Sequence, residues 1–592
     1  MNVLIVGSGG REHALAWLLS RSKSVSSILV VPGNPGIERV AKCSVRGSSY
    51  EIDTVRDIAR THQPDLIVVG PAEPLLDGIA DSLRSDGFDV VGPPRAAAEI
   101  GCSKTAAKEV MERYGIPTPE YRTCDDPDAA IAAVEEFDTP VMVKADGLAS
   151  GTGVVLCHTR ESAELAIDGA LRQRRFGAAG DRVVIERHVP GTEVSLTVLV
   201  DESGYVMLPT ALDHTQIGEG GTGPNTLGMG AIVPNPEASP DTLKQIENTI
   251  VKPTVRALAD LTGESGIGYR GVIHLILLLS ESGPQLLGYK VRFGDPETQA
   301  LVSLIRGDFA VLLRGLARGR LLPAVEEASF SVADGAACTV VAAITGYPGP
   351  YTRGQTITDR AGVALEAPVV SSASDAPEKA VPTVPFGPSV QNDQIETAQV
   401  FYCAVEEKNS GDSITFLANG GRVLSVSAMG ATLRDARIRA YARLLQISFD
   451  GMVFRRDIGG EPVITAVIEE GRVFLPQFEK RGGVLPVVVQ DVETGDVLML
   501  AYANVEALRM TREKRLATFW STGRGVLWTK GETSGDTLMV EEIRVDCDQD
   551  ALVYRVRMNG PGVCHTRSES GEHRRRCFYR ILRAEGMLEH DE

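Results

Sequence analysis

Apolar runs that end in glycine or proline recur through the first hundred residues and constrain the fold more than any other feature of the chain. The runs at residues 3–7 (VLIVG), 27–33 (SILVVPG) and 65–71 (DLIVVGP) each predict a buried strand that ends in a tight turn. Segments of helical character separate these runs. Continuous apolar strands that alternate with helices are typical of a parallel sheet covered on both faces. We therefore expect residues 1–102 to form an α/β domain around such a sheet.

The size and charge of the chain set further bounds. At 592 residues it is long enough for several domains, and acidic residues outnumber basic ones by 78 to 60, a net charge of −18. Nucleic-acid binding needs an excess of Lys and Arg, so we expect no nucleic-acid partner. Apolar runs are far shorter than the roughly 18 residues of a membrane span, and the N-terminus lacks a basic leader. We expect a cytoplasmic protein without membrane contact.

Changes in composition indicate the domain boundaries. From residue 103 to 325 strand-like runs surround glycine-rich loops, and residues 326–460 add further strands and a helix. Within that part, residues 366–396 are rich in Pro, Ser and Ala, which predicts a mobile surface insertion. A new strand pattern follows, so residues 461–592 are expected to form a separate, small β-rich domain. The expected fold class is therefore a combination of α/β and α+β domains.

The first candidate site surrounds Lys144. This lysine lies at the end of an apolar strand and is followed by a glycine-rich segment, DGLASGTGV, at residues 146–154. A strand lysine beside a flexible glycine loop can hold phosphates, because backbone N–H groups and one ammonium share the negative charge. Taken alone, the pattern also fits a surface lysine before an ordinary hairpin.

Several motifs occur in order over residues 1–460: GSGGREHALAW, PGNPG, VGPAEPL, KADGLASGTGV, TGPNTLGMGA, RFGDPETQ and NGGRVL. Together they resemble the glycinamide ribonucleotide synthetase (phosphoribosylamine–glycine ligase) family. The resemblance implies an ATP-grasp fold behind a parallel pre-ATP-grasp domain. It also implies an enzyme that uses Mg-ATP to activate glycine as an acyl phosphate and joins it to phosphoribosylamine. Carried over by motif position, it implies ATP phosphate ligands at Lys104 and Lys144, adenine- and ribose-side contacts at Glu186 and Glu193, and substrate-side residues at Arg292 and Asp295.

The chain departs from this family's pattern at several positions around one site. Where the family has Glu-Phe-Asn, whose Glu and Asn hold magnesium, this chain has Gly288-Tyr289-Lys290. Neither a glycine side chain nor an ammonium can coordinate a cation. The other departures are Thr215 and Gln216 in place of Lys-Arg, Gly221, Leu227, Thr152, and FYCAV at residues 401–405. We therefore expect the ligase activity of this half to be lost or changed.

A second candidate site lies in VDCDQDALVYRV at residues 545–556. The pattern predicts a strand, which would place Asp546, Asp548 and Asp550 on one face because alternate side chains of a strand point the same way. Clustered carboxylates repel one another unless a cation lies among them, and hard oxygen ligands suit Mg²⁺. An exposed acidic edge or turn is the alternative.

Three cysteines accompany these aspartates. Cys547 would point to the opposite face of the strand, where it could join Cys564 and Cys577 as ligands of a second metal. Three thiolates suit Zn²⁺ and leave its fourth position open, and zinc lowers the pKa of water to near neutrality. His565 follows one of these cysteines and has an intrinsic pKa suited to proton transfer. A hydrogen-bonded structural histidine is the alternative for that residue.

Residues 465–585, with QDVETGDVLMLAYANVEAL and FWSTGRGVLWTKGETSGD, resemble phosphoribosyl-AMP cyclohydrolase of histidine biosynthesis. That family opens the adenine ring of phosphoribosyl-AMP by water attack, as a homodimer whose zinc site takes cysteines from both subunits. The chain departs from it at Thr522-Gly523, where Arg-Ser is usual, and in the longer, charged segment at residues 567–576. The resemblance implies a phosphoribosyl nucleotide substrate, a homodimer formed through this domain, and substrate contacts at Arg524, Lys530, Glu532, Thr533 and Ser534.

The sequence thus predicts a fusion of two enzymes. We expect an active cyclohydrolase, with zinc on the three cysteines, magnesium on the three aspartates and His565 as proton shuttle. Before it stands a ligase-like half that can bind ATP but has lost or changed its reaction. The alternatives are a bifunctional ligase and cyclohydrolase, a ligase recruited to a specialised nucleoside pathway, and a first half that only senses or scaffolds nucleotides.

Overall fold

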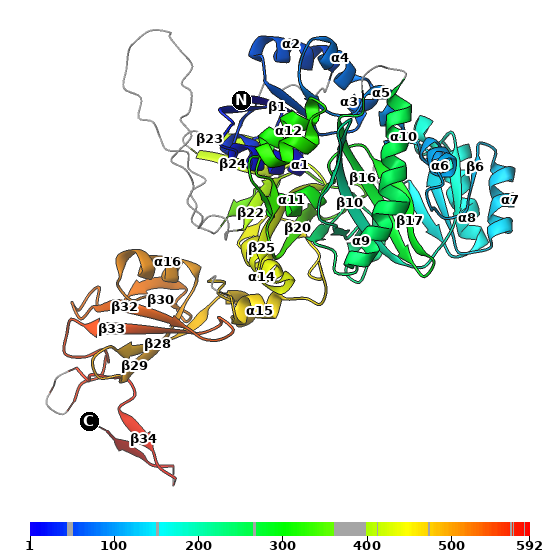
Figure 1. Cartoon of the computed structure of the whole chain (residues 1–592). Coiled ribbons are helices and arrows are strands. Elements are labelled where there is room, and N and C mark those ends of the chain that lie inside the picture. The colour runs from blue at the N-terminus through cyan, green and yellow to red at the C-terminus, as the bar shows by residue number, and fades with distance from the viewer. Residues whose placement is uncertain are drawn as a thin grey trace. The chain divides into compact units, whose positions relative to one another are not determined.

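The computed structural model describes residues 1–43, 51–149, 153–263, 268–359, 398–410, 413–471, 474–568, 571, 573–584 and 586–591. These residues form two compact units, Met1–Val463 and Ile464–Glu592 (Figure 1). The insertion expected at residues 366–396 and Thr152 of the glycine loop lie outside the described residues. Within the described ranges, no helix is long and apolar enough to cross a membrane.

The first unit begins with the parallel sheet that the sequence predicts. Alternate residues of its first strand enter two cores, Val3 and Ile5 on one face and Leu4 and Val6 on the other. A strand buried on both faces needs the continuous apolar run found here. The helices that connect the sheet are α1 Gly10–Ser20, α2 Ile52–His62, α3 Glu73–Leu76 and α4 Ile79–Ser85. The sheet has the order β3–β2–β1–β4–β5, with β1 Asn2–Gly7, β2 Ser27–Pro32, β3 Lys42–Cys43, β4 Leu66–Val69 and β5 Val90–Val91.

Two antiparallel sheets follow. The first has the order β6–β9–β7–β8, with β6 Tyr121–Cys124, β7 Val141–Ala145, β8 Val154–Cys157, β9 Val183–Arg187 and the helices α6 Lys104–Arg113, α7 Pro127–Phe137 and α8 Arg160–Ile167. The second has the order β11–β10–β16–β17, with β10 Thr192–Asp201, β11 Gly204–Met207, β16 Gly271–Ser280 and β17 Gly283–Lys290. Two helices, α9 Pro240–Ile246 and α10 Lys252–Gly263, lie along one face of this second sheet (Figure 1). The long apolar run at residues 272–279 is therefore a strand, within β16.

A further sheet of the first unit combines segments that are far apart in the chain. Its order is β12–β15–β20–β25–β22, with β12 Leu212–Asp213, β15 Gly230–Val233, β20 Ala336–Ile344, β22 Gln399–Tyr402 and β25 Arg422–Gly430. The short strand β27 Met452–Val453 pairs with β20. The helices here are α11 Glu297–Leu301, α12 Phe309–Ala317, α13 Leu321–Glu327 and α14 Leu433–Leu444. Because β15 and β25 both pair with β20, the TGPNTLGMGA and NGGRVL motifs are brought into one region.

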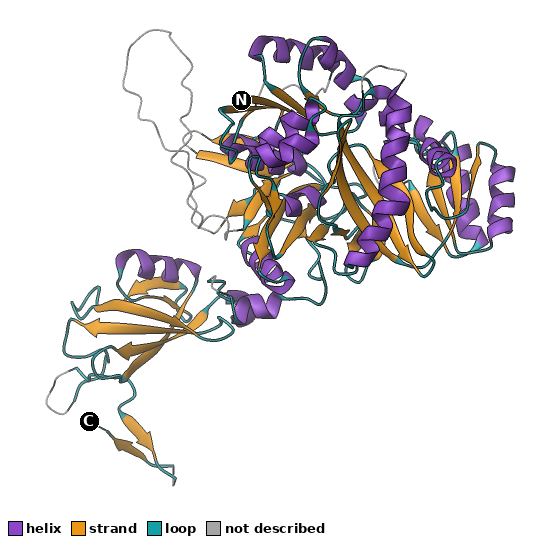
Figure 2. Ribbon diagram, in the orientation of Figure 1, coloured by secondary structure: helices purple, strands orange, loops and turns teal. Residues whose placement is uncertain are grey.

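The second unit is mainly β-structure (Figure 2). Its sheet has the order β29–β28–β33–β32, with β28 Leu485–Asp491, β29 Val497–Ala503, β32 Leu538–Val545 and β33 Leu552–Met558. Alternate residues of β28, Leu485, Val487 and Val489, are buried in its core, as the period-two pattern requires. Around the sheet are α15 Ile464–Glu469, α16 Val505–Lys514 and the hairpins β30 Thr518–Ser521 with β31 Val526–Thr529 and β34 Arg580–Leu582 with β35 Leu588–His590. The two units confirm the expected combination of α/β and α+β folds.

The three aspartates do not lie on a strand, so that sequence prediction is wrong. Residues 546–551 form the turn that joins β32 to β33. Asp546 Oδ1 accepts hydrogen bonds from the backbone N–H groups of Asp550 at 2.9 Å and Ala551 at 3.0 Å. An aspartate side chain that satisfies nearby backbone donors favours a turn over a strand, whatever the spacing of its neighbours.

Candidate active sites

Lys144 is part of a buried ion-pair cluster. It is the penultimate residue of β7, and its Nζ lies 2.5 Å from Glu186 Oε1 on the neighbouring strand β9. The other carboxylate oxygen of Glu186 pairs with Lys108 of α6. All three side chains are at most 8% exposed. Because two ammonium groups share one carboxylate, the cluster keeps a net positive charge that a phosphate can neutralise.

Lys104 begins α6 beside the glycine loop. Its Nζ donates to the carbonyl oxygens of Ala145 at 2.6 Å and Gly147 at 3.2 Å. Burial, together with the positive charge of Lys144, lowers the pKa of Lys104 to about 8. The structure thus brings two predicted phosphate ligands into electrostatic contact with each other.

The two predicted adenine- and ribose-side residues differ in their surroundings. Glu186 is buried and engaged by lysines on both carboxylate oxygens. Glu193 lies on β10 of the next sheet, where it is exposed and within electrostatic reach of Lys144 and Lys290. Glu193 therefore links the region of Lys144 to that of Lys290, while the nucleotide roles of both glutamates stay predictions.

We expect nucleotide affinity to fall as the pH rises through about 8. A free Lys104 that loses its proton near this pH offers no positive charge to phosphate, so binding above it requires the uptake of a proton. Titration calorimetry with ADP should show affinity falling by up to about tenfold per pH unit above that pKa. Lys104→Arg, whose guanidinium stays charged, should flatten the profile. The same decline in both proteins would show that another group is responsible.

Asp295, in the RFGDPE segment, forms a second cluster with residues from distant parts of the chain. Its Oδ2 lies 3.1 Å from Arg422 Nη2, and its Oδ1 accepts a hydrogen bond from Gln299 Nε2 at 2.8 Å. Arg422 also donates to the carbonyl oxygen of Leu227 at 3.0 Å. Although burial raises the pKa of Asp295, the charges of Arg422 and Arg11 hold it below its usual value. Arg422 thereby joins β25 to the loop before β15 and to RFGDPE.

Arg292 and the first glycine turn belong to the same region. Burial, followed by the positive charge of Arg11, lowers the pKa of Arg292 to about 10. Arg11 Nε lies 2.6 Å from Glu12 Oε1, and the other oxygen of Glu12 accepts from the N–H of Gly9 at 2.7 Å. A Cβ atom at Gly9 would stand 4.0 Å from Asp295. The GSGG turn therefore lies beside the predicted substrate residues.

Glu297 is the centre of a third, buried cluster. Its Oε1 lies 3.0 Å from His274 Nε2 and 3.8 Å from Lys290 Nζ. Although burial raises the pKa of Glu297, Lys290 and His274 hold it well below its usual range. Burial and the charge of Glu297 raise the pKa of Asp213 well above its usual value. Lys290, where the resemblance implies Asn, is therefore a counter-charge to buried acidic groups.

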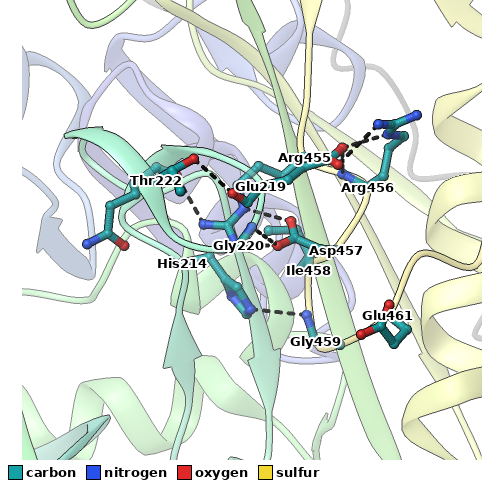
Figure 3. Close-up of polar contacts among 12 residues, drawn as sticks. His214, Glu219, Gly220, Thr222, Arg455, Arg456, Asp457, Ile458, Gly459 and Glu461 are labelled. Carbon is teal, nitrogen blue, oxygen red and sulfur yellow. Dashed lines mark hydrogen bonds and ion pairs between the residues drawn. The ribbon is translucent and has the colours of Figure 1, made fainter.

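A short hairpin, β13 Gln216–Gly218 with β14 Thr222–Asn225, begins directly after Thr215. Thr215 and Gln216 are the two positions where the resemblance implies Lys and Arg. Burial and the charge of Arg455 lower the pKa of His214 to about 4, so its neutral ring can accept a hydrogen bond. Residues 455–459 hold the hairpin at the end of the first unit (Figure 3). The contacts drawn there include Arg456 with Glu219 at 2.6 Å, Gly220 N–H with Asp457 Oδ2 at 2.7 Å and Gly459 N–H with His214 Nε2 at 3.1 Å.

In the second unit the three aspartates meet although they lie on a turn. One carboxylate oxygen from each of Asp546, Asp548 and Asp550 lies within 4.8 Å of the others. Lys480 Nζ lies 3.0 Å from Asp548 Oδ2, and Arg481 Nη2 lies 3.2 Å from Asp550 Oδ2, so two cations partly neutralise the cluster. Three hard oxygen donors that converge in this way are of the type that Mg²⁺ prefers, and the magnesium itself stays a prediction.

The structure brings two of the three predicted zinc ligands together. The thiols of Cys564 and Cys577 interact directly, and Cys564 Sγ lies 3.0 Å from Thr566 Oγ1. Although burial opposes it, hydrogen bonds with Thr566 hold the pKa of Cys564 below its usual value. Cys577 is exposed, yet desolvation of its thiol and the charge of Cys564 raise its pKa to about 11. Cys547 is exposed and, within the described part of one chain, forms no metal-ligand group with the other two; His565 is exposed.

The predicted substrate contacts of the second unit lie on and after the β30–β31 hairpin. Arg524 is exposed in the hairpin turn and donates to Ser521 Oγ at 3.3 Å. Lys530 lies near Cys577, since its charge acts on that thiol. The remaining three occupy an exposed turn: Glu532, Thr533 and Ser534. Their contact with a substrate stays a prediction.

Sequence reasoning missed Lys108, Glu297 and Arg422. Lys108 stands four residues after Lys104 in a helix, and this spacing places both on one helix face, which is a usable signal. The other two lie inside motifs that the sequence singles out, RFGDPETQ and NGGRVL. The partner of Arg422, Asp295, is more than a hundred residues away, and no local pattern predicts such a contact.

Comparison with known proteins assigns both halves. Residues 1–101, 102–298 and 337–461 match the N domain, the ATP-grasp (A) domain and the C domain of phosphoribosylglycinamide synthetase, and residues 499–579 match phosphoribosyl-AMP cyclohydrolase. The phosphoribosylamine–glycine ligase of Rhizobium meliloti (strain 1021) is 38% identical over 464 residues, which cover 78% of this chain and 99% of that protein. The ligase of the same name from Halalkalibacterium halodurans is 37% identical over 463 residues, covering 78% and 97%.

Solved structures support the same assignment. The phosphoribosylamine–glycine ligase of Thermotoga maritima has a TM-score of 0.61 and 29% identity, and covers 77% of this chain and 100% of its own. The biotin carboxylase domain of Hydrogenobacter thermophilus 2-oxoglutarate carboxylase, with a TM-score of 0.56 and 14% identity over 81% of this chain and 97% of its own, shares the fold alone. These matches confirm both resemblances. The chain therefore belongs to the phosphoribosylglycinamide synthetase family and carries a phosphoribosyl-AMP cyclohydrolase domain after its ligase-type domains.

Proposed function

We propose that the chain is a bifunctional enzyme, with an ATP-dependent phosphoribosylamine–glycine ligase in the first unit and a phosphoribosyl-AMP cyclohydrolase in the second. The observation that carries the ligase is the 38% identity over 464 residues to a phosphoribosylamine–glycine ligase. The buried cluster of Lys108, Lys144 and Glu186 supports it. The cyclohydrolase rests on the family match at residues 499–579 and on the convergence of its aspartates.

Loss of the ligase activity, which the substitutions lead one to expect, finds no support in the comparisons. Relatives that carry the ligase name align across the whole first half, not only with its sheets. The groups that would hold phosphate lie within electrostatic reach of each other, with Lys144 buried and Lys104 half-buried, and Asp295 keeps its cationic partner. We therefore prefer the bifunctional alternative, and interpret the substitutions as a change in which charged groups surround the bound substrates.

In the ligase reaction, a carboxylate oxygen of glycine attacks the γ-phosphorus of ATP and ADP leaves, which gives an acyl phosphate. The amine of phosphoribosylamine then attacks the acyl carbon, phosphate leaves and an amide forms. Lys104 and Lys144 would stabilise the negative charge on the phosphoryl oxygens in the first step. Arg292 and the Asp295–Arg422 pair would orient the substrates, because they lie beside the N-terminus of α1 where the sheet strand β1 ends.

In the cyclohydrolase, the donor sets suit two metals. Asp546, Asp548 and Asp550 would hold Mg²⁺, and Cys564 and Cys577 would hold Zn²⁺ with Cys547 of a second copy. When bound, zinc supplies Lewis acidity that makes water a nucleophile near neutral pH. The exposed His565 would carry the proton, and Lys530 and Arg524 would bind the phosphoribosyl nucleotide. A homodimer is thus part of the proposal, because one chain brings only two thiols together.

One set of assays on the purified full-length protein tests both activities. Phosphate release from Mg-ATP with phosphoribosylamine and glycine should exceed that of Lys144→Ala by at least about 100-fold, the effect of removing one charge-stabilising group. Hydrolysis of phosphoribosyl-AMP in both preparations controls for folding. Equal phosphate release in the two proteins, beside an active cyclohydrolase, would contradict the ligase and favour a nucleotide sensor or scaffold.

A further inference from the structure

Lys290, the last residue of β17, is a positive charge in the ligase half in addition to Lys104 and Lys144 beside the glycine loop. Its Nζ lies 3.8 Å from Glu297 Oε1, and its side chain keeps 29% of its surface exposed. Among the described residues, no carbonyl or side chain accepts a hydrogen bond from this ammonium, although it has three donors. Glu297 instead makes its shorter contact, 3.0 Å, with His274. Lys290 is therefore held near Glu297 by charge, and its N–H groups are available to donate hydrogen bonds to a ligand.

The side chains at this place do not fit a divalent cation. Gly288 and Lys290 are two residues apart on one strand and share a face, with Tyr289 buried between them. Glycine offers no ligand and an ammonium repels a cation, so the pair cannot replace the carboxylate and amide that the family uses for magnesium. A Cβ atom at Gly288 would meet no other atom within 4 Å, so the space beside Lys290 is open.

The acidic groups around Lys290 indicate that a positive charge belongs there. Glu297 is completely buried, and within the described residues its Oε2 has no hydrogen-bond partner; the same holds for Asp213 Oδ1. Buried carboxylate oxygens without partners are costly, and an opposite charge nearby offsets that cost. Lys290 acts electrostatically on both carboxylates. Glu193, which is within reach of both Lys290 and Lys144, connects this cluster to the phosphate-binding lysines.

We propose that the Lys290 ammonium is the cation that this chain itself supplies to the terminal phosphates of a bound nucleoside triphosphate or diphosphate, where the family places a metal-binding pair. The inference rests on the proposed function, because it requires the phosphates to lie at Lys104 and Lys144. A tethered ammonium neutralises one negative charge without a resident ion, but cannot bridge two phosphoryl oxygens as a metal does. Binding of the nucleotide should therefore depend little on divalent cations.

Titration calorimetry with ADP, in excess Mg²⁺ and in EDTA, measures this dependence on the full-length protein. In the wild type the Kd should differ by less than about threefold between the two conditions. Lys290→Met keeps the length of the side chain and removes its charge, and should weaken binding in EDTA by about tenfold or more. Lys244→Met, at a lysine in the same half that is 74% exposed, is the matched control and should leave both values unchanged.

A double variant tests the same inference by replacing the ammonium with residues that can bind a metal ion. Gly288→Glu with Lys290→Asn restores the acid and the amide, and the open space at Gly288 accommodates the new side chain. This protein should bind ADP about tenfold or more tightly with Mg²⁺ than with EDTA. Cyclohydrolase turnover and the far-UV circular dichroism spectrum show whether each variant is folded.

The outcomes separate this inference from the function on which it rests. Wild-type binding that falls tenfold or more in EDTA, or Lys290→Met binding that equals the wild type there, would overturn the role of Lys290 and leave the ligase standing. Absence of ADP binding in both conditions would overturn the inference and the ligase together. Weak magnesium dependence in the wild type that becomes strong in the double variant is the result that the structure predicts.

Discussion

Cys564→Ser should remove zinc and cyclohydrolase turnover together. Cys564 is buried, has a pKa held below its usual value by Thr566, and lies against Cys577, so its thiolate is the best prepared ligand of the three. A serine hydroxyl stays protonated and binds zinc poorly. Because residues that only position metal ligands cost about 10–100-fold when changed, loss of a ligand should cost more than about 100-fold in turnover. Atomic absorption and the hydrolysis of phosphoribosyl-AMP measure the two losses.

Mixing two inactive variants tests where the third ligand comes from. Cys547 is exposed and apart from the other two thiols within one chain, so we expect it to complete the site of a partner. If so, a dimer of one Cys547→Ser chain and one Cys564→Ser chain contains one intact site. Random reassociation of equal amounts should then restore roughly a quarter of wild-type turnover. No recovery in a mixture shown to contain heterodimers would place all three ligands in one chain, and full turnover of zinc-free Cys564→Ser would refute the zinc site itself.

Much of the fold follows from local sequence patterns. The parallel sheet was predictable because strands buried on both faces require continuous apolar residues, and the runs at residues 3–7 and 65–71 have no other simple interpretation. The strand β7, its lysine and the loop after it follow in the same way. The family resemblance adds which of these elements carry the site. The resemblance is recognised from short motifs, however, and does not show which residues of different motifs contact one another.

The contacts that define the sites could not be predicted from local patterns. The alternation of Asp546, Asp548 and Asp550 is typical of a strand. The segment is a turn, however, because Asp546 accepts hydrogen bonds from nearby backbone N–H groups, and the three carboxylates still converge. The partnership of Lys108 with Glu186 depends on how a helix packs against a strand. The charge balance around Lys290 likewise depends on Glu297 and Asp213, which come from other parts of the chain.

The contact of Arg422 with Asp295 leads to the second large expected effect. Arg422→Met should destabilise the ligase half by about 3 kcal/mol and reduce ligase turnover to background. Both side chains are 11% exposed, so the variant removes the ion-pair partner of a buried Asp295 carboxylate and leaves only the more distant charges of Arg11 and Arg292. It also removes the hydrogen bond that Arg422 donates to Leu227. Thermal unfolding followed by calorimetry measures the stability of that half, and cyclohydrolase turnover, which belongs to the other compact unit, should be unchanged.

Two further variants identify the cause of that loss. Arg456→Met removes an arginine from an exposed pair with Glu219 in the same half, and should leave the stability of that half nearly unchanged because water screens such pairs. Adding Asp295→Asn to Arg422→Met removes the unpaired charge, so most of the lost stability should return while ligase turnover stays at background. Equal destabilisation by the Arg422 and Arg456 variants would mean that the buried pair has no special role. Recovery of turnover in the double variant would show that the pair supports the fold and not the substrates.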